Sequence, residues 1–276
     1  MIIITSSISI LGMIVLPILL GFWLTRKFKL SWKLFFAGAA TFIASQILHI
    51  PFLVGMTGLF NNGTLPSPPA AWATAFNAVF LGLAAGVFEE TSRWVLFKFF
   101  LKKNRTWNEG VLVGAGHGGV EAFFLGLMSV FTIINMIVLR NVDMSMMGIP
   151  AEQLAAAQQQ VDAFWASPAY VGLLGFVERI FAITLHIALS MMVLYGIANK
   201  KPLWFWLAVL WHSLVDAVAV YTMPLIGALG VEGIVAVMAL ISLAILFGLR
   251  KKFGEQNPPE VQDDANAVKS PSSVVG

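Results

Sequence analysis

The chain consists of long apolar stretches separated by short polar segments. Seven stretches approach or exceed the ~20 apolar residues that a helix needs to cross a bilayer. They cover residues 3–24, 34–59, 70–101, 109–139, 169–199, 202–222 and 224–249. The pattern therefore predicts an all-α fold, a polytopic transmembrane helix bundle of about seven spans.

The polar segments divide the chain into two parts. Residues 1–252 form a membrane domain, and residues 253–276 are polar and proline-containing, which predicts a disordered cytoplasmic tail. The first stretch has its basic residues after it and no clear small-residue cleavage site, so we expect a retained helix rather than a signal peptide. Residues 141–168 contain an Ala/Gln-rich run after Pro150. We interpret it as an external linking helix; a helix lying on the membrane surface is the alternative.

Composition excludes a soluble protein, since 58% of residues are hydrophobic and only 11% are charged. The absence of cysteine excludes disulfides, thiolate metal sites and a cysteine nucleophile. The net charge is +3, but the basic residues cluster at the ends of spans, which indicates membrane orientation and no nucleic-acid partner. These clusters follow the first, third, fifth and seventh spans, so we expect the N-terminus outside and the C-terminus inside.

Ionisable side chains interrupt the apolar spans in four places. Each costs on the order of 2.5–3.5 kcal/mol at the bilayer centre, so their presence indicates a functional site. At ~1.5 Å per helical residue they lie about 12–21 Å from the internal ends of four different spans. The set is Glu89, Glu90, Arg93, His117, Glu121, His186, His212 and Asp216.

Spacing predicts that these groups point inward. Glu89 and Arg93, His117 and Glu121, and His212 and Asp216 are each four residues apart, so each pair shares one helix face. In lipid that face must turn to the bundle interior. We expect Arg93 to pair with Glu89, and Glu90 to face somewhat aside.

Other ionisable residues are left outside the predicted site. By the same estimate of depth from helical rise, Glu178 and Arg179 lie ~30 Å from the internal end of their span, which favours an interfacial ion pair. His49 precedes the proline at position 51, where a lone histidine is usually structural.

Histidines and carboxylates in one layer have the composition of a divalent-metal site, since these ligands suit zinc and related ions. A single helical His/acid pair is more often a structural hydrogen bond, but four groups at one depth favour a site. The metal ligands that we expect are His117, Glu121, His186 and His212.

Glycines surround His117 in the fourth span. No strand precedes them, so a nucleotide-binding loop is disfavoured. Gly114 and Gly118 instead form a small-xxx-small ridge, which predicts close packing against a neighbouring helix.

Four short motifs within residues 70–222 resemble those of the glutamate-dependent intramembrane proteases. They are EETSR at 89–93, GHGGVE at 116–121, LHIALS at 185–190 and HSLVD at 212–216. That superfamily includes the CAAX-prenyl-protein endopeptidases, the bacterial CPBP/Abi proteins and PrsW, and the chain is most similar to its YhfC-like membrane peptidase branch. The resemblance covers about half the chain and depends on the order and spacing of all four motifs.

The resemblance implies hydrolysis of a peptide bond within the bacterial cytoplasmic membrane, on a membrane protein or peptide. Glu89 corresponds to the base that activates water and Arg93 to its partner, while Glu121 occupies the second-motif position. The chain has EExxR where the CAAX group has EExxxR, and it has His117 and His186 in addition, so prenyl-protein specificity does not carry over. The implied catalytic residues are Glu89, Glu90, Arg93, Glu121, His212 and Asp216.

Two other functions also place ionisable groups inside a membrane. One is a proton- or metal-coupled transporter, and the other is a noncatalytic immunity-type membrane protein. A protease requires Glu89 for cleavage, whereas a transporter would move its cargo without cutting any peptide.

Overall fold

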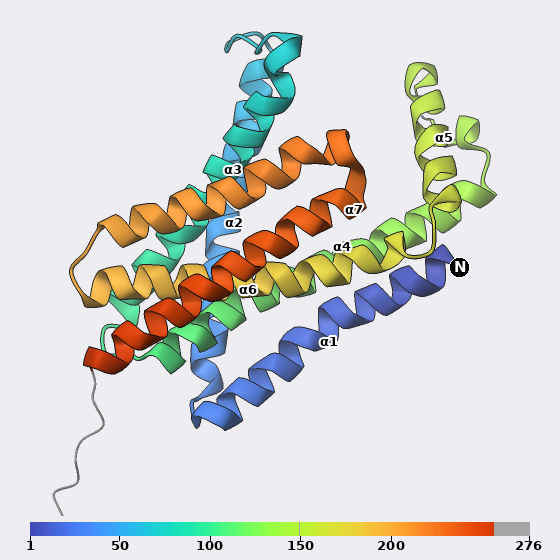
Figure 1. Cartoon of the computed structure of the whole chain (residues 1–276). Helices are drawn as coiled ribbons and strands as arrows, with labels where there is room; N and C mark the ends of the chain where they lie inside the picture. The colour runs from blue at the N-terminus through green and yellow to red at the C-terminus, as the bar shows by residue number, and fades with distance from the viewer. Residues whose placement is uncertain (149, 257–276) are drawn as a thin grey trace, which may run out of the picture.

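The computed structural model describes residues 1–148 and 150–256, and the described part of the chain is a bundle of helices (Figure 1). The helices are α1 Ile2–Phe28, α2 Trp32–Asn61, α3 Ala70–Val95, η1 Leu96–Phe100, α4 Trp107–Asn141, η2 Met144–Met147, α5 Ala151–Ala166, α6 Val171–Ala198 and α7 Leu203–Gln256. The predicted all-α class is confirmed. Helix α7 continues to Gln256, so residues 253–256, which the prediction assigned to the tail, are helical; residues 257–276 of the predicted tail lie outside the described part.

Among the described residues, six helices are long and apolar enough to cross a membrane. The last of them, α7, reverses direction at Gly227, so its two limbs run antiparallel, as the last two predicted spans would (Figure 1). Gly227 has φ 69°, a conformation that glycine adopts without the steric cost of a Cβ. The boundary between the sixth and seventh predicted spans, at residue 223, lies close to this turn, and Pro224 itself lies within the helix.

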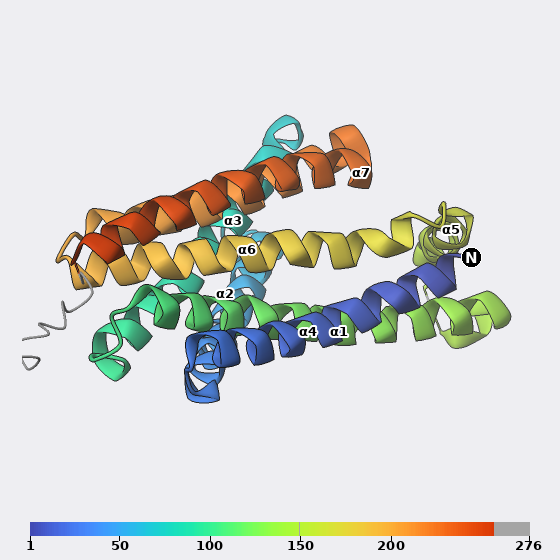
Figure 2. The same ribbon diagram turned by 60° about the horizontal axis from the view of Figure 1, so that its bottom comes forward.

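Four of the long helices, α1, α4, α6 and α7, run roughly side by side, whereas α2 and α3 form a hairpin that crosses them steeply (Figures 1 and 2). In this arrangement α2 packs on α4, and α3 packs on α7. The polar centre therefore forms where the hairpin crosses the other helices.

The basic clusters gather at one end of the bundle, as their spacing predicts. The rings of Phe28 and Trp107 are 6.0 Å apart, and the Arg250 guanidinium lies 5.0 Å from the Trp107 ring. The Lys252 ammonium lies 5.3 Å from the Trp204 ring, which brings both ends of α7 to the same place. That this end faces the cytoplasm stays a prediction.

Glycines allow the helices around the centre to approach closely. A Cβ at Gly38 would lie 1.9 Å from the Val113 carbonyl oxygen, so the α2 and α4 backbones touch. A Cβ at Gly114 would lie 2.6 Å from Cα of Ile187, which confirms the predicted ridge and locates its partner on α6. At Gly86 on α3 a Cβ would lie 2.8 Å from the Val209 carbonyl oxygen on α7. These contacts leave no room for a larger residue and fix the spacing of the helices.

The segment between α4 and α6 is helical, as predicted. Its helix α5 runs across the direction of α4 and α6 (Figure 1). The Trp165 indole donates a hydrogen bond of 3.2 Å to the Met136 carbonyl, and the Arg140 guanidinium lies 4.1 Å from the Trp165 ring. A position along the membrane surface remains an expectation.

Candidate functional site

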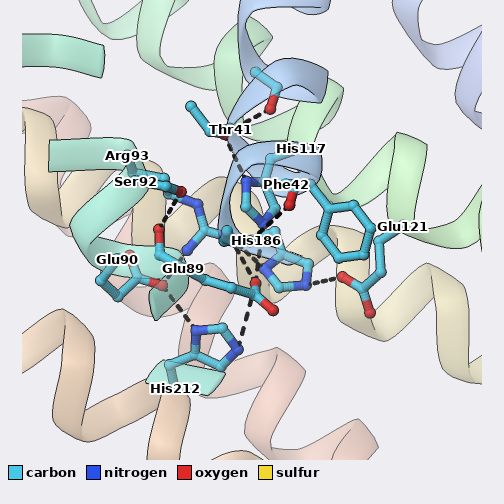
Figure 3. Close-up of polar contacts among 12 residues, drawn as sticks. Thr41, Phe42, Glu89, Glu90, Ser92, Arg93, His117, Glu121, His186 and His212 are labelled. Carbon is cyan, nitrogen blue, oxygen red and sulfur yellow. Dashed lines mark hydrogen bonds and ion pairs between the residues drawn. The ribbon is translucent and has the colours of Figure 1, made fainter. Parts of the chain in front are cut away.

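Ionisable side chains from α3, α4, α6 and α7 meet at one place in the bundle (Figure 3). Most of them are buried, and Arg93 and His117 are completely so. The structure thus brings together the groups that the depth estimate placed in one layer: Glu89, Glu90, Arg93, His117, Glu121, His186, His212 and Asp216.

Glu89 lies at the centre of this cluster. Its Oε2 is 3.0 Å from Nε2 of His117, 3.6 Å from Nη2 of Arg93 and 3.9 Å from Nε2 of His212. Its Oε1 accepts a hydrogen bond of 3.3 Å from the Gln46 side chain on α2. One carboxylate is therefore approached by two imidazoles, a guanidinium and an amide.

Two of the histidines have one ring nitrogen held from behind and the other turned to Glu89. Nδ1 of His212 is 2.8 Å from Glu90, whose carboxylate can only accept, so Nδ1 carries the proton and Nε2 has a free lone pair. Nδ1 of His117 is 2.7 Å from the Thr41 hydroxyl, which itself donates to the Gly38 carbonyl. Polar groups behind a histidine fix its tautomer and orientation in this way at metal sites.

His186 is held between two charged groups. Its Nε2 pairs with Glu121, and its Nδ1 is 2.7 Å from Nη2 of Arg93. Because a guanidinium only donates, Nδ1 is the acceptor and the proton of the neutral ring lies on Nε2, facing Glu121. Glu121, predicted as a metal ligand, thus lies behind His186, in the place that Glu90 takes behind His212.

Glu90 was expected to face somewhat aside, but it points into the site. It is fully buried, forms an ion pair with Arg93 and accepts the hydrogen bond from His212. Residues three apart also share a helix face, and α7 covers the side of α3 that carries Glu90. The predicted ion pair of Arg93 with Glu89 is present at 3.6 Å, but Glu90 is the nearer partner.

Arg179 and Glu178 also belong to the cluster, contrary to the prediction. Arg179 is buried, its Nη1 is 2.5 Å from Oε1 of Glu121, and it forms a second ion pair with Glu178. The depth estimate considered positions along one helix only. The long side chain of Arg179 on α6 reaches the carboxylate of Glu121 on α4. The sequence did contain a signal for Arg179, because a buried Glu121 needs a positively charged partner.

Two groups on α2 were missed altogether, Thr41 and Gln46. Each reaches the site through a single hydrogen bond, to His117 and to Glu89 respectively. Lone threonines and glutamines carry no sequence pattern, so only the close packing of α2 on α4 reveals them.

A cavity of about 100 Å³ adjoins Glu89, which is room for several water molecules. Its polar lining comes from Glu89, Glu121, Glu178, Arg179, His186, His212 and Asp216. Apolar residues of the second limb of α7, including Val235 and Met238, form the opposite wall. Asp216 is 36% exposed and lies 3.5 Å from Nε2 of His212, so it extends the polar lining outward.

The donor set and its charge fit a divalent cation. Glu89, His186 and His212 each offer one ligand atom, and these three atoms lie within 4.8 Å of one another. Five carboxylates (Glu89, Glu90, Glu121, Glu178, Asp216) face two guanidiniums (Arg93, Arg179), which leaves three negative charges when all are ionised. Uncompensated charge is costly away from water, and a cation offsets it.

Comparison with known proteins identifies a family whose description names a metal-dependent protease. The family described as YhfC intramembrane metalloprotease matches residues 12–245. The uncharacterized membrane protein YhfC of Bacillus subtilis is 33% identical over 244 residues, which cover 86% of this chain and 92% of that protein. No solved structure matches.

Proposed function

Because the chain belongs to the YhfC intramembrane metalloprotease family, we propose that it hydrolyses a peptide bond of a membrane protein or peptide within the bilayer. The observation that carries the proposal is the gathering of His117, His186 and His212 around Glu89, each with a polar or charged side chain behind its ring. A purely structural cluster has no need of three histidines that are each supported by a side chain behind the ring.

The three imidazoles would hold a divalent cation, zinc being the ion that suits this donor set. When bound, such an ion lowers the pKa of its water to ~7 and polarises a carbonyl group. Thr41, Glu90 and Glu121 orient the rings from behind rather than binding the ion. This assigns Glu121 an orienting role in place of the ligand role expected from its spacing.

Arg93 is the cationic partner at the site. Its Nη2 contacts Nδ1 of His186, the atom that a metal ion would also require, and Oε2 of Glu89, the proposed base. Because a guanidinium stays protonated, Nδ1 of His186 would be free to hold a metal only if Arg93 turned away from it. Glu90, its other partner, then keeps the guanidinium in place.

Glu89 takes the role of general base. It is buried and adjoins the cavity. One of its carboxylate oxygens is turned to the histidines and the other to Gln46. A carboxylate so placed removes a proton from a water molecule in the cavity and returns it to the amine as the C–N bond breaks. The apolar wall from α7 keeps bulk water away, which strengthens the electrostatic interactions inside.

The proposed setting is the bacterial cytoplasmic membrane, with the basic end of the bundle in the cytoplasm. Basic residues in short loops favour that side during insertion.

Mapping of newly formed protein termini tests the proposed function. Membranes from cells that produce the wild type, Glu89→Gln or a matched carboxylate-to-amide control, Asp162→Asn on the exposed face of α5, are compared by mass spectrometry. We expect termini that depend on wild type and Asp162→Asn and disappear with Glu89→Gln. Identical sets of termini in all three samples would exclude a protease.

A further inference from the structure

His49 on α2 is a buried histidine to which the contacts of the site give no role. Its exposed fraction is 8%, and within the described residues neither ring nitrogen has a hydrogen-bond partner. An imidazole offers a donor and an acceptor, and leaving such a group buried and unpaired costs ~1–3 kcal/mol. The structural role expected from the sequence would require hydrogen bonds that His49 does not make. A partner that arrives with the substrate explains it better.

The position of His49 relates it to the reacting groups. It shares the buried face of α2 with Thr41 and Ser45, each one helical turn further back, and Thr41 holds His117. Gln46, three residues before His49, donates to Oε1 of Glu89. Side chains three apart on a helix are neighbours, so a group that lies against Glu89 is also within reach of His49.

Electrostatic interaction points the same way. The charges of Glu89 and His212 both act on the His49 ring. His49 therefore lies within the electrostatic range of two central groups of the site.

Aromatic rings close the other side of His49. Its ring stacks on Phe88, with centroids 5.3 Å apart, and Phe88 directly precedes Glu89. The Phe52 ring lies 5.2 Å from the Phe88 ring and 6.0 Å from the Phe80 ring, which continues the aromatic contact between α2 and α3. The stack covers a face of the imidazole, so a hydrogen bond of His49 can form only at the ring edge, where its two nitrogens have no partner.

We propose that His49 is a further catalytic residue of the hydrolysis proposed above, on which this role rests: its N–H donates a hydrogen bond to the carbonyl oxygen of the scissile peptide bond. The water oxygen bonds to the carbonyl carbon, the water proton passes to Glu89, and the negative charge develops on the carbonyl oxygen. The His49 N–H stabilises that oxyanion. When the C–N bond breaks, the proton on Glu89 goes to the amine, so His49 donates a hydrogen bond throughout and transfers no proton.

Removal of one such donor lowers kcat by roughly 100- to 1,000-fold, since the bond strengthens as the charge develops. The same change leaves KM and bound metal unaltered, because His49 is neither a metal ligand nor a general binding contact. The four histidines of the chain then have separate duties: three hold the metal and one holds the oxyanion.

Kinetics of the purified, zinc-loaded protein in lipid nanodiscs test this role. The probe is a synthetic membrane peptide that spans a Glu89-dependent cleavage site found by terminus mapping. His49→Phe retains the aromatic stack but has no N–H, and His49→Leu serves if the first variant fails to fold. His49→Gln has an amide donor, and Phe52→Leu disturbs the same stack without touching the imidazole.

We expect His49→Phe to lose kcat by the stated factor with unchanged KM and zinc content, His49→Gln to recover part of the loss, and Phe52→Leu to cleave normally. Wild-type kcat in His49→Phe or in His49→Leu would overturn the role, as would an equal loss in Phe52→Leu or a parallel loss of zinc. If no Glu89-dependent cleavage exists, the proposed function fails and this role with it. If Glu89-dependent cleavage is found but its kcat does not depend on His49, only the proposed role of His49 fails.

Discussion

Gly38 lies where the α2 and α4 backbones touch, and replacing it with alanine separates the two helices. The new Cβ would be 1.9 Å from the Val113 carbonyl oxygen, and ordinary contact begins at 3.4 Å, so the helices must part by about 1.5 Å. Overpacking of this kind costs ~1–3 kcal/mol. Three residues further along α2, Thr41 would be drawn away from its 2.7 Å bond to His117.

The expected result has two parts. Gly38→Ala lowers the unfolding temperature and weakens zinc binding by roughly 10- to 100-fold, the usual effect of losing a group that orients a metal-binding histidine. Both are measured in detergent, by thermal unfolding and by competition with a chromophoric chelator.

Gly55→Ala is the matched control, because it makes the same change in the same helix at a position with nothing within 4 Å. It should bind zinc normally and be slightly stabilised, since alanine is favoured over glycine inside a helix by ~0.5–1 kcal/mol. Equal zinc affinity and equal unfolding temperature in Gly38→Ala and the wild type would refute the reasoning that close approach of α2 positions His117.

Further predictions concern the groups behind the histidines. Glu90→Gln removes the carboxylate that holds His212 and should weaken zinc binding roughly 10- to 100-fold, as measured by chelator competition; unchanged affinity would contradict its orienting role. Arg179→Met leaves Glu121 buried without its guanidinium and should destabilise the protein by about 3–5 kcal/mol in chemical unfolding, whereas adding Glu121→Gln should restore much of that stability. If the double variant is as unstable as the single one, the ion pair is not the cause. Chelation of the metal should abolish Glu89-dependent cleavage and re-addition of zinc should restore it; cleavage that persists after the metal is removed would exclude a metalloprotease.

The fold and the location of the site follow from the sequence to a large extent. Apolar length identifies the spans, and the cost of ionisable groups in lipid forces Glu89, His117, His186 and His212 to a common interior. These inferences succeed because the bilayer permits few structures and penalises exposed charge heavily.

The contacts inside the site do not follow, because they depend on how helices rotate and approach one another. Spacing of four residues suggested Glu89 as the partner of Arg93, but rotation of α3 toward α7 makes Glu90 the nearer one. Depth along one helix excluded Arg179, although its side chain reaches Glu121 on α4. The reversal of α7 at Gly227, just beyond the predicted boundary between the last two spans, likewise depends on the backbone angles of a single residue.

Metal content of the purified protein tests the central claim most directly. The wild type should contain a single divalent ion per chain by mass spectrometry, His49→Gln should retain it, and His212→Gln should lose it. A wild type without bound metal, or a His212→Gln variant with as much metal as the wild type, would contradict a metal site built from these histidines.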